Sequence, residues 1–262
     1  MTMLDIAAAR EALLAARTSG TPLKALPTGS EPTDLEGAYA VQDALVDALG
    51  RRTVGWKVGA TNDAAQQMLG VPGPIFGRVL EGTLFTSPGE VPMSLFTNPP
   101  LAECELGFEL GADLPASAAP FDRATVLAAV RAVVPTIELV SHRYVGTAAE
   151  VGGIRLVADN ALAAALVVGP RNDPSVASTL PTAEVALELD GAEVARGDGS
   201  AVLGDPVEAL VWLANELAAR GLQLHAGDVV TTGSCTGLTP LLSGVTARND
   251  AGPLGAVQVV VR

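Results

Sequence analysis

The sequence predicts an α+β protein in which a helical section, residues 1–50, precedes a larger body of mixed or antiparallel sheet, residues 51–262. Up to Gly50 apolar residues recur at helical spacing, whereas from Arg52 onward short β-type runs are separated by Gly and Pro. These runs are clustered with few helices between them, which favours α+β over a doubly wound nucleotide-binding fold. The length of 262 residues, without internal repeats, predicts one structural domain overall.

The N-terminal section contains two predicted helices. The first runs over Leu4–Arg17 and follows a capping box formed by Thr2 and Asp5. A proline-punctuated link leads to a second box, Thr33 and Glu36, which opens a helix that continues to the end of the section.

The body is predicted from its apolar runs and from its turn residues. Asp190-Gly191 is a strong hairpin signal between two of the runs. The predicted strands are Thr53–Val58, Glu103–Leu110, Thr136–Val140, Ala161–Val168, Val185–Leu189, Ala192–Ala195, Asp228–Thr232, Val245–Arg248 and Ala256–Val261. The predicted helices are Asn62–Leu69, Asp122–Val134 and Pro206–Gly221, with Gly70–Pro74 as a loop.

Composition and charge exclude several classes of protein. The net charge of −13 argues against nucleic-acid binding and against an anionic membrane surface, because both depend on Lys and Arg. No apolar run is long enough to cross a bilayer, and the first residues do not form a signal peptide, so we expect a cytoplasmic enzyme. Two cysteines and two histidines are too few for a disulfide framework or for a thiolate or histidine metal centre.

Paired carboxylates on one predicted strand are the most informative chemical feature. Glu103 and Glu105 are two residues apart, so their side chains point to the same face of the strand. Two like charges on one face repel unless a cation lies between them, and Glu138 on a second apolar run could complete a three-carboxylate site. All-oxygen ligation suits Mg²⁺ or Mn²⁺. The alternative for a bare Glu-x-Glu is a solvated strand face.

Lys57 and a hydroxyl-rich loop are further candidates. Lys57 lies in an apolar, glycine-flanked strand, where it either extends its amine to the strand edge or steers an anionic substrate and exchanges protons with it. The loop Thr231–Pro240 offers N–H and O–H donors suited to a carboxylate. It also contains Cys235 in a pattern like a nucleophile elbow, but no helix is predicted to follow, and a loop-packing cysteine is favoured.

Three other polar positions have weaker signals. The pair Asp159-Asn160 precedes an apolar run, where turn-making and substrate hydrogen bonding are both open. His142 follows the predicted strand that carries Glu138, and a structural role is favoured for it. His225 is expected in a loop that leads to a strand.

Several segments in collinear order resemble the 2-keto-4-pentenoate hydratase and 4-oxalocrotonate decarboxylase family, within the fumarylacetoacetate hydrolase superfamily. The resemblance runs from about Leu35 to the C-terminus. The matching segments are Gly55-Trp-Lys-Val-Gly-Ala-Thr61, Met68-Leu-Gly-Val71, Phe76-Gly77, Glu103-Cys-Glu105, Glu138 within Ile-Glu-Leu-Val, Val157-Ala-Asp-Asn160, Val202-Leu-Gly-Asp-Pro206 with Ala209–Leu213, and Gly227-Asp-Val-Val-Thr-Thr-Gly233.

The resemblance implies a fold, a metal and an oligomer. It implies a mixed β-roll or barrel-like body, a homo-oligomer, and a Mg²⁺ or Mn²⁺ ion that is used on a small anionic 2-oxo or 2-hydroxy acid. By position, Glu103, Glu105 and Glu138 match the family's metal carboxylates, and Lys57 matches its active-site lysine. The remaining matches, which would line the substrate site, are Asp159, Asn160, Gly233 and Ser234.

One departure from the family pattern bears on the reaction. The family usually has an Asp directly before this Phe-Gly, whereas this chain has Ile75. The activity expected from the resemblance is hydration of a 2-hydroxy-2,4-dienoate to a 4-hydroxy-2-oxo acid through a metal-stabilised enolate. The alternatives are decarboxylation of the 4-oxalocrotonate type, C–C hydrolysis of an acylpyruvate, and a non-catalytic metal-binding member.

Overall fold

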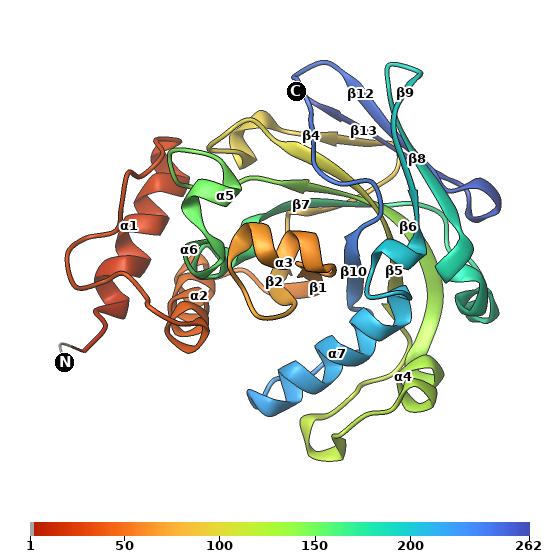
Figure 1. Cartoon of the computed structure of the whole chain (residues 1–262), viewed down its shortest axis with the longest axis horizontal. Coiled ribbons are helices and arrows are strands. Elements are labelled where there is room, and N and C mark those ends of the chain that lie inside the picture. Colours follow the sequence, from red (N-terminus) through yellow and green to blue (C-terminus); the bar gives the residue numbers. More distant parts are fainter. Residues whose placement is uncertain (1–2) are drawn as a thin grey trace.

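The computed structural model describes residues 3–262 and consists of two mixed sheets with helices around them (Figure 1). The helices are α1 Ile6–Ser19, α2 Leu35–Leu49, α3 Asp63–Leu69, α4 Arg123–Ala129, α5 Ala148–Val151, α6 Gly153–Ala158 and α7 Pro206–Ala219. The strands are β1 Thr53–Gly59, β2 Ile75–Leu80, β3 Leu84–Thr86, β4 Gly89–Val91, β5 Leu101–Leu110, β6 Val130–Val140, β7 Ala163–Val168, β8 Glu184–Leu189, β9 Ala192–Asp198, β10 Val229–Ser234, β11 Thr239–Pro240, β12 Thr246–Asp250 and β13 Ala256–Val261.

The larger sheet has the order β2-β1-β10-β5-β6-β7-β3, with β11 added to β5, and the smaller has the order β4-β13-β12-β8-β9. Parallel pairs, such as β1 with β10, occur beside antiparallel pairs, such as β5 with β6. The predicted α+β class with mixed sheet is therefore confirmed. Over residues 3–262 neither sheet closes on itself, so the body is not a closed barrel.

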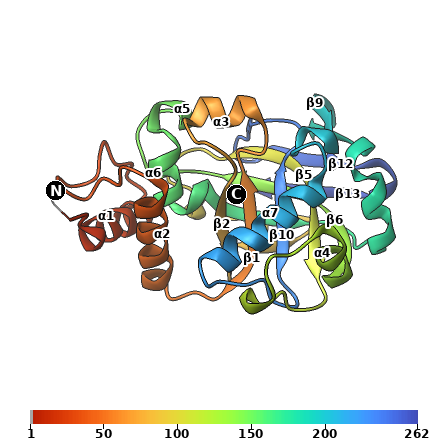
Figure 2. The ribbon, with the colours of Figure 1, turned by 60° about the horizontal axis from the view of Figure 1, so that its bottom comes forward.

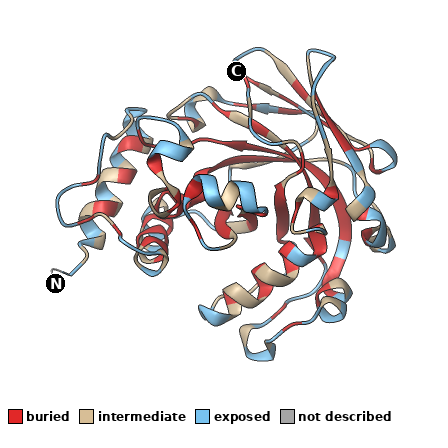
Figure 3. Ribbon diagram, in the orientation of Figure 1, coloured by how far each residue is buried: buried red, intermediate tan, exposed pale blue. Residues whose placement is uncertain are grey.

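The core lies between the sheets and beneath the helices. Strands β12 and β13 of the smaller sheet contact β6 of the larger one, and the central strands of the larger sheet are buried along most of their length (Figure 3). Helices α1 and α2 pack against each other at one end of the molecule, while α7 and α4 lie together beside β10 and β5 (Figures 1 and 2). Among residues 3–262 no helix is both long and apolar enough to cross a bilayer.

The two N-terminal helices are confirmed, but other residues cap them. Asp5 caps α1 by accepting a hydrogen bond from the Ala8 N–H, and Asp34 caps α2 by accepting one from the Gly37 N–H. The predicted box at Thr33 is therefore displaced by one residue. Thr2, predicted as part of the first box, lies outside the described residues.

The predicted helix over Asp122–Val134 is wrong beyond Ala129. Asp122 does cap a helix, but α4 ends after two turns and the chain continues as β6. The β6 segment is rich in β-branched residues and contains Pro135, which is incompatible with a continuing helix. Pairing with β5 along the whole of β6 therefore overrides the helical pattern.

Four strands, β2, β3, β4 and the two-residue β11, were not predicted, and one strand begins later than expected. β2, β3 and β4 follow the predicted Gly70–Pro74 loop, where brief apolar runs carry no clear period. The strand predicted from Ala161 begins at Ala163, because Asn160, Ala161 and Leu162 all adopt left-handed backbone conformations with φ of 59°, 50° and 65°. This turn bends the chain over the larger sheet beside β2.

Candidate metal centre and active site

Three carboxylates meet on one face of the β5–β6 pair. Glu103 lies directly opposite Glu138, and Glu105 follows two residues along on the same face. One oxygen from each carboxylate can be chosen so that all three lie within 4.8 Å of one another. Glu105 and Glu138 are buried, and Glu103 is half-buried. The structure therefore brings the three predicted carboxylates together.

The three carboxylates repel one another, and a bound cation would relieve this repulsion. Burial raises the pKa of Glu105 well above its usual range, and the charges of Glu138 and Glu103 raise it further. Burial also raises the pKa of Glu138, to about 7, although the Lys57 ammonium opposes this change. In addition, Glu105 Oε1 is buried and accepts no hydrogen bond from the described residues, and the buried Glu138 Oε2 has only the Lys57 ammonium near it, at 3.4 Å. Unsatisfied oxygens of this kind fit a hard divalent cation.

Neighbouring side chains hold Glu105 in place through its other oxygen. Glu105 Oε2 accepts hydrogen bonds from Thr231 Oγ1 and from the Gly233 N–H, the latter at 2.8 Å. Thr231 Oγ1 also lies 2.7 Å from Thr136 Oγ1, and Asn249 Nδ2 donates to the Thr136 carbonyl. The Glu105 oxygen that points away from these donors is thus left for the cation. The sequence placed Thr231 in a segment with donors suited to a carboxylate, whereas Thr136 and Asn249 were not predicted.

Lys57 is the cation that the structure places against this cluster. Its Nζ lies 3.4 Å from Glu138 Oε2, and its side chain is almost fully buried. Burial alone would lower the pKa of Lys57, but the carboxylates of Glu138, Glu103 and Glu105 outweigh that effect and raise it. Lys57 is therefore held as an ammonium beside the proposed metal position and does not extend to a strand edge.

Ile75 occupies the same corner of the site. A Cβ placed on Gly59 would lie 3.1 Å from Lys57 Nζ and 3.6 Å from Ile75 Cγ1, so both side chains meet above Gly59. Ile75 is 1% exposed. Of the two side chains that meet here, only Lys57 can form hydrogen bonds. The family pattern has an Asp in place of Ile75, so this chain lacks that acid beside Lys57.

One small cavity adjoins the carboxylates, and a larger one lies further along the same pair of strands. The smaller, about 50 Å³, is lined by Glu103, Glu105, Gly233, Ser234 and the end of β1. Gly233 has φ +117°, and a side chain there would overlap Thr61. The structure therefore brings the predicted Gly233 and Ser234 to the carboxylates.

The second cavity, about 370 Å³, continues along the same sheet face. Leu101 and Val140, two residues beyond Glu103 and Glu138, line it together with Leu162 and other mainly apolar groups. A still larger cavity, about 760 Å³ beside Trp56 and Arg52, is lined by no residue of β5 or β6. Cavity size alone therefore does not mark the site.

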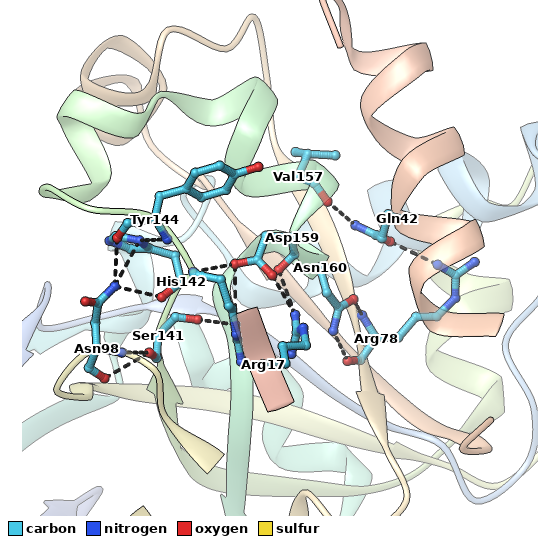
Figure 4. Close-up of polar contacts among 11 residues, drawn as sticks. Arg17, Gln42, Arg78, Asn98, Ser141, His142, Tyr144, Val157, Asp159 and Asn160 are labelled. Carbon is cyan, nitrogen blue, oxygen red and sulfur yellow. Dashed lines mark hydrogen bonds and ion pairs between the residues drawn. The ribbon is translucent and has the colours of Figure 1, made fainter. Parts of the chain in front are cut away.

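Asp159 and Asn160 belong to a different polar network (Figure 4). The Asp159 carboxylate accepts hydrogen bonds from Arg17 Nη2 and from the Arg143 N–H. Asn160 bonds the backbone N–H and carbonyl of Arg78 through its side-chain amide. Neither side chain lines the small cavity at the carboxylates or the larger one further along. The sequence predicts both residues in the substrate site; in the structure Asp159 bonds to Arg17 and Arg143, and Asn160 bonds to the backbone of Arg78.

Cysteine and histidine have other environments. Cys235 is buried, which raises the pKa of its thiol above the usual range, and bends and a short strand, not a helix, follow it. His142 Nδ1 accepts a hydrogen bond from the Tyr144 N–H, as expected for a structural residue. His225 lies in the loop before β10, where its N–H bonds Asp228.

Comparison with known proteins gives consistent results. The model of the fumarylacetoacetate (FAA) hydrolase C-terminal family matches residues 64–261. A 2-keto-4-pentenoate hydratase of Paraburkholderia xenovorans is 34% identical over 229 residues, which cover 86% of this chain and 83% of that protein. A 2-hydroxyhexa-2,4-dienoate hydratase of Comamonas testosteroni is 33% identical, covering 89% of this chain and 87% of that protein. The solved structure of 4-oxalocrotonate decarboxylase from Pseudomonas putida G7, complexed with magnesium and adipate, superposes with a TM-score of 0.89 at 28% identity and covers 98% of this chain and 97% of that one.

Proposed function

This chain belongs to the fumarylacetoacetate hydrolase family, and we propose that it is a divalent-metal-dependent hydratase acting on 2-hydroxy-2,4-dienoates. The observation that carries the proposal is the buried Glu103–Glu105–Glu138 cluster with the Lys57 ammonium beside it. The relatives of similar length that are named as hydratases support this activity. In the net reaction water adds across C4=C5 of the dienoate, so that C5 gains a proton and C4 gains a hydroxyl. The C2=C3 enol also becomes a ketone, because C3 gains a proton and the 2-hydroxyl loses one, and the product is a 4-hydroxy-2-oxo acid.

In the proposed reaction the carboxylates bind the metal and Lys57 handles a proton. Glu103, Glu105 and Glu138 would hold Mg²⁺ or Mn²⁺, which supplies positive charge against the carboxylate and the adjacent oxygen of the substrate. Lys57 Nζ carries a proton beside the carboxylate cluster. It can donate this proton to the substrate or orient the attacking water. Gly233 and Ser234 border the same small cavity, and we expect the Gly233 backbone and the Ser234 hydroxyl to contact the substrate carboxylate there.

The hydrogen bonds of the neighbouring network refine the predicted substrate contacts. The side chains of Asp159 and Asn160 form hydrogen bonds with arginine and backbone groups. We therefore propose that they fix the turn at Asn160–Leu162. That turn brings Leu162, and not a polar side chain, to the cavity beyond the carboxylates.

The lining of the 370 Å³ cavity favours the hydratase over a decarboxylase of the 4-oxalocrotonate type. A dicarboxylate would place its second charge away from the metal, and among the lining residues there is no Lys or Arg to pair with it. The titratable group in the lining is His142, and burial lowers the pKa of His142, so it is neutral near pH 7. An uncharged, apolar tail therefore fits this cavity.

Product analysis tests the proposed reaction. With Mg²⁺ present, we expect 2-hydroxypenta-2,4-dienoate to gain one water, as seen by mass spectrometry, while 4-oxalocrotonate and an acylpyruvate are turned over far more slowly. Loss of carbon dioxide from 4-oxalocrotonate as the fastest reaction would replace the hydratase by a decarboxylase. Cleavage of the acylpyruvate would move the chain to C–C hydrolysis, and three intact substrates would indicate a non-catalytic metal-binding protein.

Substrate preference tests the apolar cavity separately. We expect kcat/KM to rise by up to about fourfold for each methylene added to the tail, since a buried CH₂ contributes ~0.8 kcal/mol. Leu162→Ala should weaken this preference, whereas Leu242→Ala, an exposed leucine, should not. Equal kcat/KM for alkyl-tailed and carboxylate-tailed dienoates would contradict the assignment of the cavity.

We also propose a cytoplasmic location, and the family resemblance leads us to propose that the chain forms a homo-oligomer. Light scattering on the purified chain measures the oligomeric state directly. A mass equal to that of one chain at working concentration would refute the homo-oligomer.

A further inference from the structure

Four arginines line one cavity on a chain whose net charge is strongly negative. The cavity, about 230 Å³, lies between α1, the end of α2 and the strands β2 and β7. Its lining includes Arg17, Arg51, Arg78 and Arg143, hydroxyl groups and the Asn160 amide, and no carboxylate. With a formal charge of −13 over the whole chain, such a concentration of guanidinium groups is not a consequence of composition.

The positive charge of this arginine cavity is only partly compensated. Arg78 pairs with Asp43 at 2.6 Å. Arg17 and Arg143 share the single carboxylate of Asp159, at 2.8 and 3.5 Å. The fourth arginine, Arg51, makes no ion pair within residues 3–262 and is exposed. Three guanidiniums therefore face one carboxylate, and two positive charges remain without a partner.

Two of the arginines that line the cavity also have a buried hydrogen-bond donor without a partner among the described residues. Arg143 is only 2% exposed, yet its buried Nε bonds to no other described group, and the same holds for Arg17 Nε. An unsatisfied buried donor is costly, and more so when it is charged. Burial, followed by the nearby charge of Arg17, lowers the pKa of Arg143 to about 10, which is the change expected where a compensating anion is missing.

We propose that the arginine cavity is a binding site for a small oxyanion, distinct from the metal centre. Planar guanidinium groups recognise phosphate and carboxylate oxygens through paired N–H donors, and two negative charges would match the uncompensated positive charge. The site adjoins Asp159 and Asn160, which fix the turn that carries Leu162. A bound anion would therefore stabilise the part of the chain that borders the apolar substrate cavity.

Thermal unfolding at constant ionic strength tests this site with two probes, inorganic phosphate and malonate. For the unmodified full-length protein with Mg²⁺ we expect a saturable rise in Tm with at least one probe, beyond that produced by chloride. Arg51→Gln should raise the half-saturating concentration by about tenfold or more, because it removes an unpaired charge from the cavity. Arg52→Gln is the matched control: it makes the same change at the next residue, which does not line this cavity.

The choice of Arg51 keeps the test independent of folding and of catalysis. Arg51 is exposed and has no ion pair to lose, so its variant is expected to fold normally. Saturation by phosphate alone, by malonate alone or by both, weakened by Arg51→Gln and not by Arg52→Gln, supports the site and identifies the class of anion. No saturable effect of either probe overturns it. So does an equal response of Arg51→Gln and Arg52→Gln, because phosphate acting at the metal centre would affect both variants alike.

Discussion

Replacing Glu105 by glutamine is expected to weaken Mg²⁺ or Mn²⁺ binding by at least about 100-fold, since even the outer-shell partners of a metal ligand typically account for 10–100-fold. Glutamine keeps the volume of the side chain, and its amide oxygen can still accept from Thr231 and Gly233. The variant loses the negative charge of the carboxylate, whose Oε1 has no hydrogen-bond partner in the parent protein. Hydration activity should fall in parallel. Isothermal titration calorimetry with each metal measures the affinity.

The same variant should be no less stable than the parent protein when metal is absent. Burial and the charges of Glu138 and Glu103 raise the pKa of Glu105, so at a pH above the usual carboxyl range the charge of this side chain opposes folding. Removing that charge should leave the Tm of the metal-free protein unchanged or higher, whereas simple structural damage would lower it. Glu184→Gln, at an exposed position on β8, is the control for loss of one carboxylate. Unchanged metal affinity in the Glu105 variant would refute the assignment of the metal ligands.

The geometry of the metal centre was largely predictable because strand alternation is a strict rule. Glu103 and Glu105 must share a face once the segment is a strand, and only the register with β6 remained to place Glu138 opposite. That register depends on contacts between segments about 30 residues apart in sequence. The family motifs, matched in collinear order, indicated that Glu138 joins Glu103 and Glu105, which the local strand pattern could not show.

Long-range pairing explains most of what the sequence did not reveal. The first residues of β6 look helical in isolation and become a strand because β5 pairs with them along their length. The left-handed turn at Asn160–Leu162 contains no glycine, so the sequence does not predict it. It is fixed by Arg17, Arg78 and Arg143, which come from three distant elements. The same tertiary convergence creates the arginine cavity, which no run of basic residues in the sequence indicates.

Replacing Lys57 by methionine is expected to lower kcat by about 10²–10⁴-fold, the usual contribution of a positioned proton donor. Methionine has a similar length and suits a buried site, so the fold should persist. Metal affinity should be equal or higher, because the variant removes a positive charge 3.4 Å from Glu138. A lysine that only stabilised the fold would give a different result, with Tm reduced and kcat preserved in the metal-loaded protein.

Two further variants make the result specific to Lys57. Lys24→Met changes the chain's other lysine, which is exposed, and should leave kcat unchanged. Lys57→Arg keeps the charge but cannot give up a proton near neutral pH, so it should restore stability in the metal-free protein without restoring kcat. This combination follows from a lysine that both compensates three carboxylates and moves a proton. Near-normal kcat in Lys57→Met would limit Lys57 to charge compensation, and the proton would then have to come from bound water, since the neighbouring Ile75 has none to give.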